Sequence, residues 1–317
     1  MTSRPGSLER RELVRTSCGG TGSNRWGPRM FIRRIVAAVD ASELARRAAE
    51  RAVSLAGRWG AELTLVNVYE TVPAESSTIL TATIIDENSR LASVQNIKAL
   101  AEALGEPELR TVVRPGRDVP GTVCEVATRE GADLVVVGTF GRTGVSRFFM
   151  GSVAENVVRR ASCPVWVERP TEPIVRDVER LMVCTDLSAM GQAGVALASE
   201  LASELDVTIE MVHALEAPYR ALSLETRREL RKERREQLTQ LAATHFEGPP
   251  PRVTVVEGAN VVDAITGHAA RTSPDLLVLA THGHTGLSRV FMGSIAERVT
   301  RFAPCSVLVA RSPVPTS

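Results

Sequence analysis

The sequence predicts an α/β fold of two tandem domains, each a doubly wound parallel sheet of five strands. The first observation is an internal duplication, because the segment "GTFGRTGVSRFFMGS" at 138–152 returns as "ATHGHTGLSRVFMGS" at 280–294. Gly141 and Gly283 lie 142 positions apart, so each copy has the size of a domain rather than of a solenoid repeat. The second observation is that short Val- and Ile-rich segments alternate with amphipathic stretches in each copy. This alternation is typical of parallel strands joined by right-handed helical crossovers.

The first copy contains strand-like segments that are only a few residues long and rich in Val and Ile. Five such segments are expected to form strands, at 34–39, 62–68, 110–114, 133–138 and 163–168. Helical patterns lie between them, at 43–57, roughly 86–104, 118–130 and 152–161. Asp118 is expected to cap the third helix and Gly131 to end it. The strands are apolar throughout, which indicates a sheet covered by helices on both faces.

The second copy repeats this order of elements. The segment 35–57 parallels 181–203, and 112–139 parallels 255–281. We expect a disordered extension rich in Gly, Ser and Arg at 1–30 and a first domain at 31–169. A linker with prolines at 170–178 then leads to a second domain at 179–313.

Composition and charge exclude several functional classes. Lys and Arg number 38 against 37 Asp and Glu, a formal net charge of +1, which gives no electrostatic basis for nucleic acid or an anionic membrane as the main partner. No apolar run approaches the roughly 20 residues of a membrane span. The five cysteines form no CxxC pair, and no His spacing suits a metal. We therefore expect free thiols in a cytoplasmic protein that has no metal site.

In a sheet of this kind, ligands bind beyond the carboxyl ends of the strands, where the winding reverses direction. The first strand ends at Asp40 and the fourth at Gly138, and these strands become neighbours if the chain crosses over after the third strand. Asp40 has two interpretations. It is either a turn residue that enters the first helix or, with Ser42 as the helix cap, a carboxylate that accepts from a hydroxyl or amino group of a ligand.

A glycine-spaced loop follows the fourth strand. Gly138 and Gly141 flank a tight turn in which a side chain would block close approach of the backbone. Gly151 and Ser152 open the fourth helix, whose unpaired amides and partial positive charge suit a phosphate. Ser152 either caps this helix or turns its hydroxyl to the anion. Arg142 either neutralises phosphate charge or is a surface arginine.

The pattern G-x2-G-x9-G-[ST] after the fourth strand, with Asp at the end of the first, resembles the universal stress protein family in both copies, over residues 31–311. The resemblance implies a sheet of order 3-2-1-4-5 in each domain and a pseudo-two-fold axis at which the fifth strands pair. In the nucleotide-binding branch of the family it also implies bound ATP, which we expect with Mg²⁺. The implied binding residues of the first copy are Ala38, Val39, Asp40, Val68, Gly138, Gly141, Arg142, Gly151, Ser152 and Val153.

The second copy departs from this pattern at one position. Its implied binding residues are Asp186, Ala214, Gly283, Gly293, Ser294 and Ile295, but Ala280 replaces the first glycine. A methyl group that overpacks a tight site typically costs about 1–3 kcal/mol. We therefore expect a competent first site and a weaker second site.

The sequence as a whole predicts an ATP-binding regulatory protein of the stress response, in which nucleotide occupancy controls conformation or partner binding. No Walker A, GxSxG or HExxH motif is present, so no catalytic residue is assigned, and slow ATPase or self-phosphorylation activity is the most that we expect. We also expect tandem chains to associate as a homodimer. The alternative is a scaffold of the same fold that mediates dimerisation or other interactions and binds no nucleotide. A relative of ATP pyrophosphatases or electron-transfer flavoproteins fits less well, because the first strand is not followed by an SGGxDS-like loop.

Overall fold

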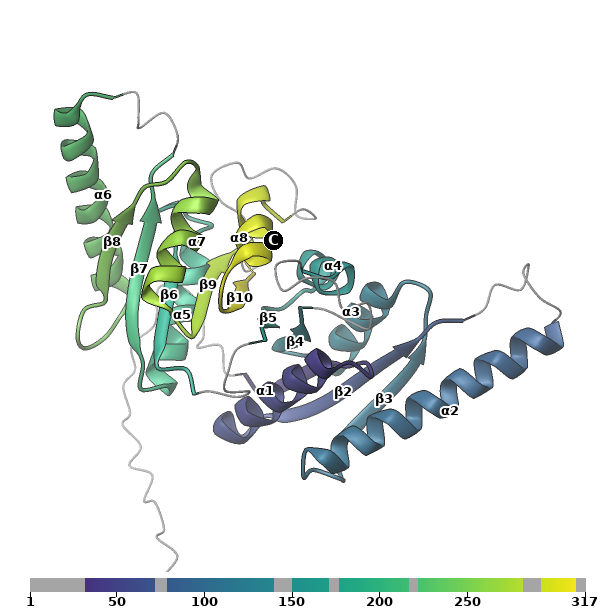
Figure 1. Ribbon diagram of the computed structural model, residues 1–317. Coiled ribbons are helices and arrows are strands. Elements are labelled where there is room, and N and C mark those ends of the chain that lie inside the picture. The colour runs from purple at the N-terminus through teal and green to yellow at the C-terminus, as the bar shows by residue number, and fades with distance from the viewer. Residues whose placement is uncertain are drawn as a thin grey trace, which may run out of the picture.

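The ten strands of the molecule form one continuous sheet, and Figure 1 shows its two halves side by side. The computed structural model describes residues 32–71, 79–139, 150–170, 177–216, 222–281 and 292–311. The strand order is β3-β2-β1-β4-β5-β10-β9-β6-β7-β8. Each half therefore has the order 3-2-1-4-5, mirrored in the second half, which confirms the predicted fold class. The predicted extension at 1–30 and most of the predicted linker at 170–178 lie outside the described residues.

In the first half, strands and helices alternate as the sequence predicts. The elements are β1 (Arg34–Ala38), α1 (Glu43–Trp59), β2 (Glu62–Tyr69), α2 (Ile79–Ala103), β3 (Arg110–Pro115), α3 (Val119–Glu130), β4 (Leu134–Gly138), α4 (Ser152–Arg160) and β5 (Val165–Glu168). Asp118 caps α3 by accepting from the Gly121 amide, and Gly131 ends it in the left-handed conformation at φ 60°, as predicted.

Helix α2 begins at Ile79 rather than near residue 86, where the sequence places its start. Its first turns carry Ile84 and Ile85, whose side chains are 53% and 41% exposed. Because these two isoleucines are exposed rather than packed against the sheet, they do not show the periodicity that marks a packed helix.

The second half repeats the same order. Its elements are β6 (Arg180–Cys184), α5 (Gln192–Glu204), β7 (Thr208–Ala214), α6 (Leu224–His245), β8 (Arg252–Val256), α7 (Val261–Thr272), β9 (Leu276–Ala280), α8 (Ser294–Phe302) and β10 (Ser306–Ala310). None of the described helices is both long and apolar enough to cross a membrane.

Helices cover both faces of the sheet, which explains why the strands are apolar on both sides. One buried cluster joins the strands to α3, α4, α7 and α8, and the other joins them to α1, α2, α5 and α6. Strand β9, which lies between β10 and β6, is buried along its whole length. This double covering leaves only the two ends of the strands for a ligand.

The two halves meet where β5 and β10 pair antiparallel, with Trp166 opposite Leu308. The surrounding contacts are reciprocal. Arg159 in α4 binds Glu297 in α8 at 2.6 Å, and Arg301 in α8 binds Glu155 in α4 at 2.6 Å. Contacts that exchange in this way are the mark of an isologous interface, here formed within one chain.

Two arginines that follow the fifth strands extend this reciprocity. Arg169 donates to the Thr300 carbonyl at 2.7 Å, near the C-terminus of α8, and Arg311 donates to the Val158 carbonyl in α4. Burial lowers the pKa of the Arg169 guanidinium to about 10. A cation near the C-terminus of a helix compensates the unpaired carbonyls there, so each half stabilises a helix of the other.

One buried network at this seam has no counterpart in the second half. Glu168 is 1% exposed and accepts from the side chains of Arg51 at 3.2 Å, Trp166 at 2.6 Å and Ser306 at 3.1 Å. The Arg51 guanidinium also lies over the Trp166 ring, 5.4 Å from its centroid. In the second half, Leu197 and Ala310 occupy the positions equivalent to Arg51 and Glu168.

We predict that Arg51→Leu lowers the free energy of unfolding by about 3–5 kcal/mol, because it leaves the Glu168 carboxylate buried without its cation. The double variant Arg51→Leu/Glu168→Ala, which copies the residues of the second half, should be more stable than Arg51→Leu alone. Urea unfolding of both variants measures the difference. A double variant that is less stable than the single one would contradict this account of the network.

Candidate functional site

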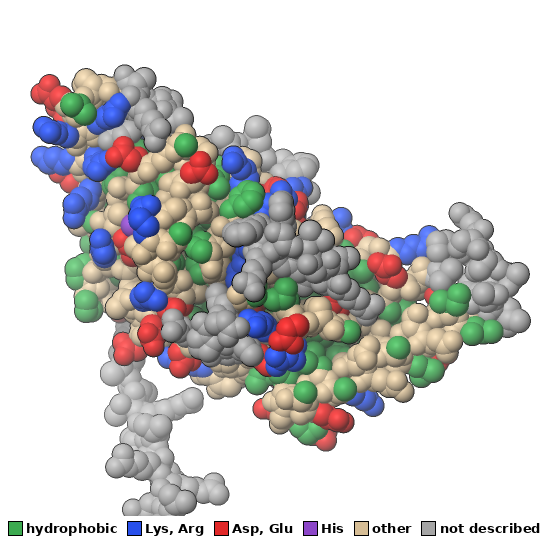
Figure 2. Space-filling view, in the orientation of Figure 1, with side chains coloured by type: hydrophobic (Ala, Val, Ile, Leu, Met, Phe, Trp, Pro, Cys, Tyr) green, Lys and Arg blue, Asp and Glu red, His purple; other side chains and the backbone are tan. Residues whose placement is uncertain are grey.

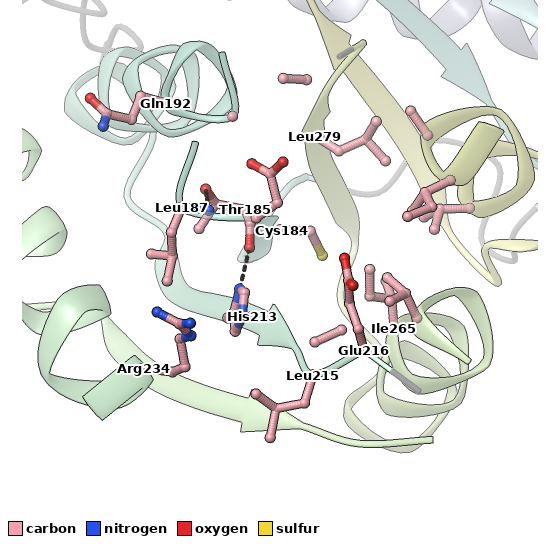
Figure 3. Close-up of a pocket in the computed structure, with 18 of the residues that line it drawn as sticks. Cys184, Thr185, Leu187, Gln192, His213, Leu215, Glu216, Arg234, Ile265 and Leu279 are labelled. Atoms are coloured by element: carbon pink, nitrogen blue, oxygen red, sulfur yellow. Dashed lines mark hydrogen bonds between the residues drawn. The ribbon is translucent and has the colours of Figure 1, made fainter. Parts of the chain in front are cut away.

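A cavity of about 1170 Å³ opens at the carboxyl ends of the second-half strands (Figure 3). The ends of β6, β7 and β9, the starts of α5 and α8, and one face of α6 form its walls. The predicted site residues that line it are Asp186, Ala214, Gly293, Ser294 and Ile295. Gly283 lies outside the described residues. The structure therefore brings together in one cavity all the second-half candidates that it describes.

The turn between β6 and α5 orients Asp186. Its Oδ1 atom accepts from the amide of Ser188 at 3.0 Å and from the Ser188 hydroxyl at 2.6 Å. Leu187, between them, has a φ of 67°, a left-handed conformation that non-glycine residues rarely adopt. Strain of this kind is typical of functional sites. Leu187 also lines the cavity, and no motif in the sequence pointed to it.

A side chain from the second strand of each half holds the backbone that follows the first strand. In the second half, His213 Nδ1 lies 3.0 Å from the Thr185 carbonyl oxygen (Figure 3). In the first half, the equivalent residue Asn67 donates to the Val39 carbonyl at 2.8 Å. No sequence motif predicted a role for His213, which occupies the position on β7 equivalent to that of Asn67 on β2.

Helix α8, which starts at the cavity, has no side-chain cap. Gly293 is the N-cap residue of α8, and its amide donates to the Thr281 carbonyl at 2.7 Å. Ser294 is the first helical residue, so it does not cap the helix. By contrast, side chains cap four other helices through Ser42, Asp118, Ser223 and Asn260. The amides of the first turn of α8 therefore have no side-chain acceptor among the described residues, and they begin at the cavity wall.

Helix α6 supplies a wall that the sequence did not predict. Leu230, Arg234, Gln237 and Leu241 line the cavity and recur at the spacing of one helix face. The abundant charges of this helix indicated a solvated element, and most of its other residues are exposed, apart from Leu238 and Ala242, which are buried. In Figure 3 the side chain of Arg234 points from α6 into the cavity, which gives the cavity one cation.

The first-half candidates occupy the equivalent edge of the sheet. Strand β1 pairs with β4 so that Ala38 lies opposite Val137, which places the end of β1 beside Gly138. The Gly151 amide donates to the Thr139 carbonyl and ties the start of α4 to the end of β4. Gly151 is the N-cap residue of α4, so Ser152, like Ser294, is not a cap.

The remaining first-half candidates lie at or near the same edge. The Val39 amide donates to the Val66 carbonyl, so Val68 lies farther along β2 toward its carboxyl end. Asp40 Oδ1 accepts from the Ser42 amide at 2.9 Å, and Ser42 caps α1 as predicted. Val153 is 38% exposed at the start of α4. Gly141 and Arg142 lie outside the described residues.

The described residues offer no metal centre, since they contain no group of three or more His, Cys, Asp or Glu side chains that could hold a metal ion. One thiol, that of Cys184, lines the cavity. Burial raises the pKa of this thiol, so it stays protonated near neutral pH and is a poor nucleophile there.

A sequence model of one known family, described as the universal stress protein family, matches residues 31–169 and again residues 178–311. The chain belongs to the universal stress protein family. A universal stress protein of Methanocaldococcus jannaschii is 35% identical over 141 residues, which cover 43% of this chain and 81% of that protein.

One solved universal stress protein shows the same fold over most of this chain. The crystal structure of this protein, from Archaeoglobus fulgidus, covers 89% of this chain and 98% of its own, at 16% identity and a TM-score of 0.62. Another, in complex with cAMP, covers 44% of this chain and 98% of its own, at 26% identity and a TM-score of 0.34.

The two universal stress protein halves place small residues differently where the first helix crosses the fourth strand. A Cβ atom on Gly138 would lie 2.8 Å from the Leu44 carbonyl oxygen in α1, so this glycine is required by helix packing. In the second half, Ala280 occupies the strand position, and the helix instead carries Gly194, whose Cβ atom would lie 3.1 Å from the Ala280 amide nitrogen. Gly194 replaces Ala48 of the first half. The glycine at this crossing therefore lies on the strand in the first half and on the helix in the second.

This exchange gives the Ala280 methyl group a packing role between β9 and α5. Side chains alternate between the faces of a strand, so the Ala280 methyl lies on the same face as Val278, which packs in the α5 cluster. The methyl group therefore faces the space that Gly194 leaves in α5. Ala280 also lines the cavity, and residues 282–291 that follow it lie outside the described residues. The effect of this methyl group on the second site therefore stays a prediction.

We predict that Gly138→Ala and Gly194→Ala each lower the free energy of unfolding by about 1–3 kcal/mol, because each adds a methyl group against backbone that is already close. Ala280→Gly should cost no more than about 1 kcal/mol, the usual backbone penalty of glycine. Thermal or urea unfolding of the three variants provides the test. Gly138→Ala with wild-type stability would show that α1 does not constrain this position.

Proposed function

We propose that this universal stress protein binds ATP with Mg²⁺ at the carboxyl edge of each half and regulates a stress response through nucleotide occupancy. The observation that carries the proposal is the second-half cavity, which combines an uncapped helix start with a carboxylate at the opposite strand end. The cavity is large enough for a nucleotide, because ligand sites commonly enclose about 300–1,000 Å³.

The cavity residues divide into a phosphate side and a nucleoside side. On the phosphate side, the amides at Ser294 and Ile295 and the Ser294 hydroxyl would donate to phosphate oxygens, with the helix dipole adding positive potential. Arg234 would add a cation. On the nucleoside side, the Asp186 carboxylate would accept from a ribose hydroxyl, and Ala214 at the end of β7 would meet the base. The equivalent first-half residues would act in the same way.

A bound triphosphate supplies its own ligands for Mg²⁺, which in proteins keeps several waters and takes few side-chain ligands. The proposal therefore requires no carboxylate cluster. His213 and Asp186 are engaged with the Thr185 carbonyl and with Ser188. Their present bonds suit them to hold the turn that faces the nucleotide rather than to activate water, and slow hydrolysis is the most that we expect.

The further organisation follows the same proposal. The domains would run from 31 to 169 and from 179 to 313, with 170–178 as the linker. The described cysteines, Cys124, Cys163, Cys184 and Cys305, are free thiols. Free thiols agree with a cytoplasmic protein, and tandem chains would associate as a homodimer.

Isothermal titration with MgATP tests the proposal, and Ser294→Asp is the decisive variant. The added carboxylate sits at the first position of α8, where it favours the helix but repels phosphate. We expect it to weaken ATP binding at the second site at least tenfold, about 1.4 kcal/mol. The isosteric neutral variant Ser294→Asn is the matched control and should keep affinity within a fewfold.

The first site is tested by Ser152→Asp in the same way. The wild-type chain should bind two nucleotides, each single variant one with full affinity, and Ala280→Gly should not tighten the second site. If the wild-type chain gives no binding heat and releases no nucleotide on denaturation, the alternative holds, and the chain is an interaction scaffold without nucleotide.

A further inference from the structure

The sheet ends at β8, whose outer edge faces a groove. β8 pairs with β7 alone among the described strands, and its central residues 253–255 are only half-buried. A groove of about 460 Å³ runs between this edge and α6. An outer strand carries backbone amides and carbonyls that no neighbouring strand of its own sheet pairs, and these are a template for an additional strand.

The wall of this groove is basic because of the way in which α6 packs. Leu238 and Ala242 are buried and hold the C-terminal half of α6 against the sheet. One and two turns earlier on the same helix face stand Arg235 and Arg231, and both line the groove. Figure 2 shows Lys and Arg side chains gathered along α6 at the upper left of the molecule. One face of α6 is therefore apolar in the C-terminal half of the helix, where it packs on the sheet, and basic in the preceding turns, which lie beside β8.

The floor of the groove is apolar. Val253 and Val255 lie on the α6 face of β8 and pack against the cluster that contains Leu238. Arg252 also lines the groove, and its side chain is 74% exposed. Successive side chains of an added strand would alternate between the two faces of the sheet. One set would meet the valines and Arg231 and Arg235, and the other set would meet Arg252.

Two of the three groove arginines take part in surface ion pairs. Arg231 forms an ion pair with Glu257, and Arg252 lies 3.6 Å from Glu210, but surface pairs of this kind contribute about 0–1 kcal/mol and exchange readily. Arg235 is exposed and has no ion pair with any described residue. Guanidinium groups bind carboxylates through paired donors, which favours acidic ligands at this edge.

We propose that the β8 edge binds an extended acidic segment of a partner protein, which adds to the sheet as a further strand. The unpaired backbone requires an extended chain, and the arginines require that it be acidic. A second copy of this chain would bring a β8 edge with the same arginines, and like charges facing each other disfavour that pairing. The first half does not repeat the pair of arginines, because Val94 stands at the position equivalent to Arg235.

Fluorescence anisotropy with a labelled seven-residue peptide of alternating Glu and Val tests the proposal on the full chain. We expect saturable binding that Arg231→Glu/Arg235→Glu weakens at least tenfold. Lys232→Glu is the control for each arginine substitution, because it reverses one charge on the same helix away from the groove, with an 80% exposed side chain. It should change the affinity less than twofold. Thermal unfolding of each variant verifies that the fold is intact.

A second peptide separates strand addition from simple charge attraction. The same sequence with alternate amides N-methylated keeps every charge but cannot pair along a strand edge. We expect it to bind at least tenfold more weakly. Equal binding of the two peptides would overturn the proposal, as would equal weakening by Lys232→Glu. Binding of single-stranded polyadenylate or of vesicles containing phosphatidylserine with the same dependence on Arg231 and Arg235 would also overturn it, since neither offers a strand backbone.

Discussion

The candidate sites depend on one backbone hydrogen bond in each half, which ties the start of a helix to the end of a strand. The Gly151 amide donates to the Thr139 carbonyl, and the Gly293 amide donates to the Thr281 carbonyl. This bond places the start of the helix beside the carboxyl edge of the sheet. Because the N-cap residue in each case is a glycine, it has no side chain with which to cap the first turn, and no other described side chain caps it. The next amides are then presented to whatever occupies the crevice. A side-chain cap would instead have satisfied them from within the protein.

The duplication explains both what the halves share and where they differ. Their seam is held by contacts that appear twice with roles exchanged, such as Arg159 with Glu297 and Arg301 with Glu155. Loss of either side chain of such a pair would leave the other without its ion-pair partner across the seam. Elsewhere the halves solve the same packing problem differently, as when the glycine of the strand–helix crossing moves from position 138 to position 194. A difference at one position of the motif therefore does not by itself indicate a lost site, because its compensation can lie on another element.

Much of the fold could be predicted from the sequence, because strand periodicity, helix caps and the duplication all pointed to the same architecture. Asp118 caps the start of α3 and Gly131 ends the helix, as expected, because local capping chemistry determines both ends of α3. The start of α2 was not predicted, because Ile84 and Ile85 are exposed and so do not mark a packed helix face in the sequence.

For the site, the sequence identified the strand ends and helix starts, since a short motif carries them. It did not identify the α6 wall, because Arg234 and Gln237 face the cavity only through tertiary packing of a highly charged helix. It also did not show that α1 packs against Gly138, where a Cβ atom would lie 2.8 Å from the Leu44 carbonyl oxygen; the predicted role of Gly138 toward a ligand stays a prediction. Contacts between elements that are distant in sequence leave no local pattern, so neither feature can be predicted from the sequence alone.

Hydrogen–deuterium exchange measured with and without MgATP tests the central claim most directly, because it reports on the backbone amides themselves. The account predicts that nucleotide slows exchange in the segments 150–155 and 292–297, at the starts of α4 and α8. Nucleotide binding that leaves both segments unprotected, or a chain that does not bind nucleotide at all, would contradict it.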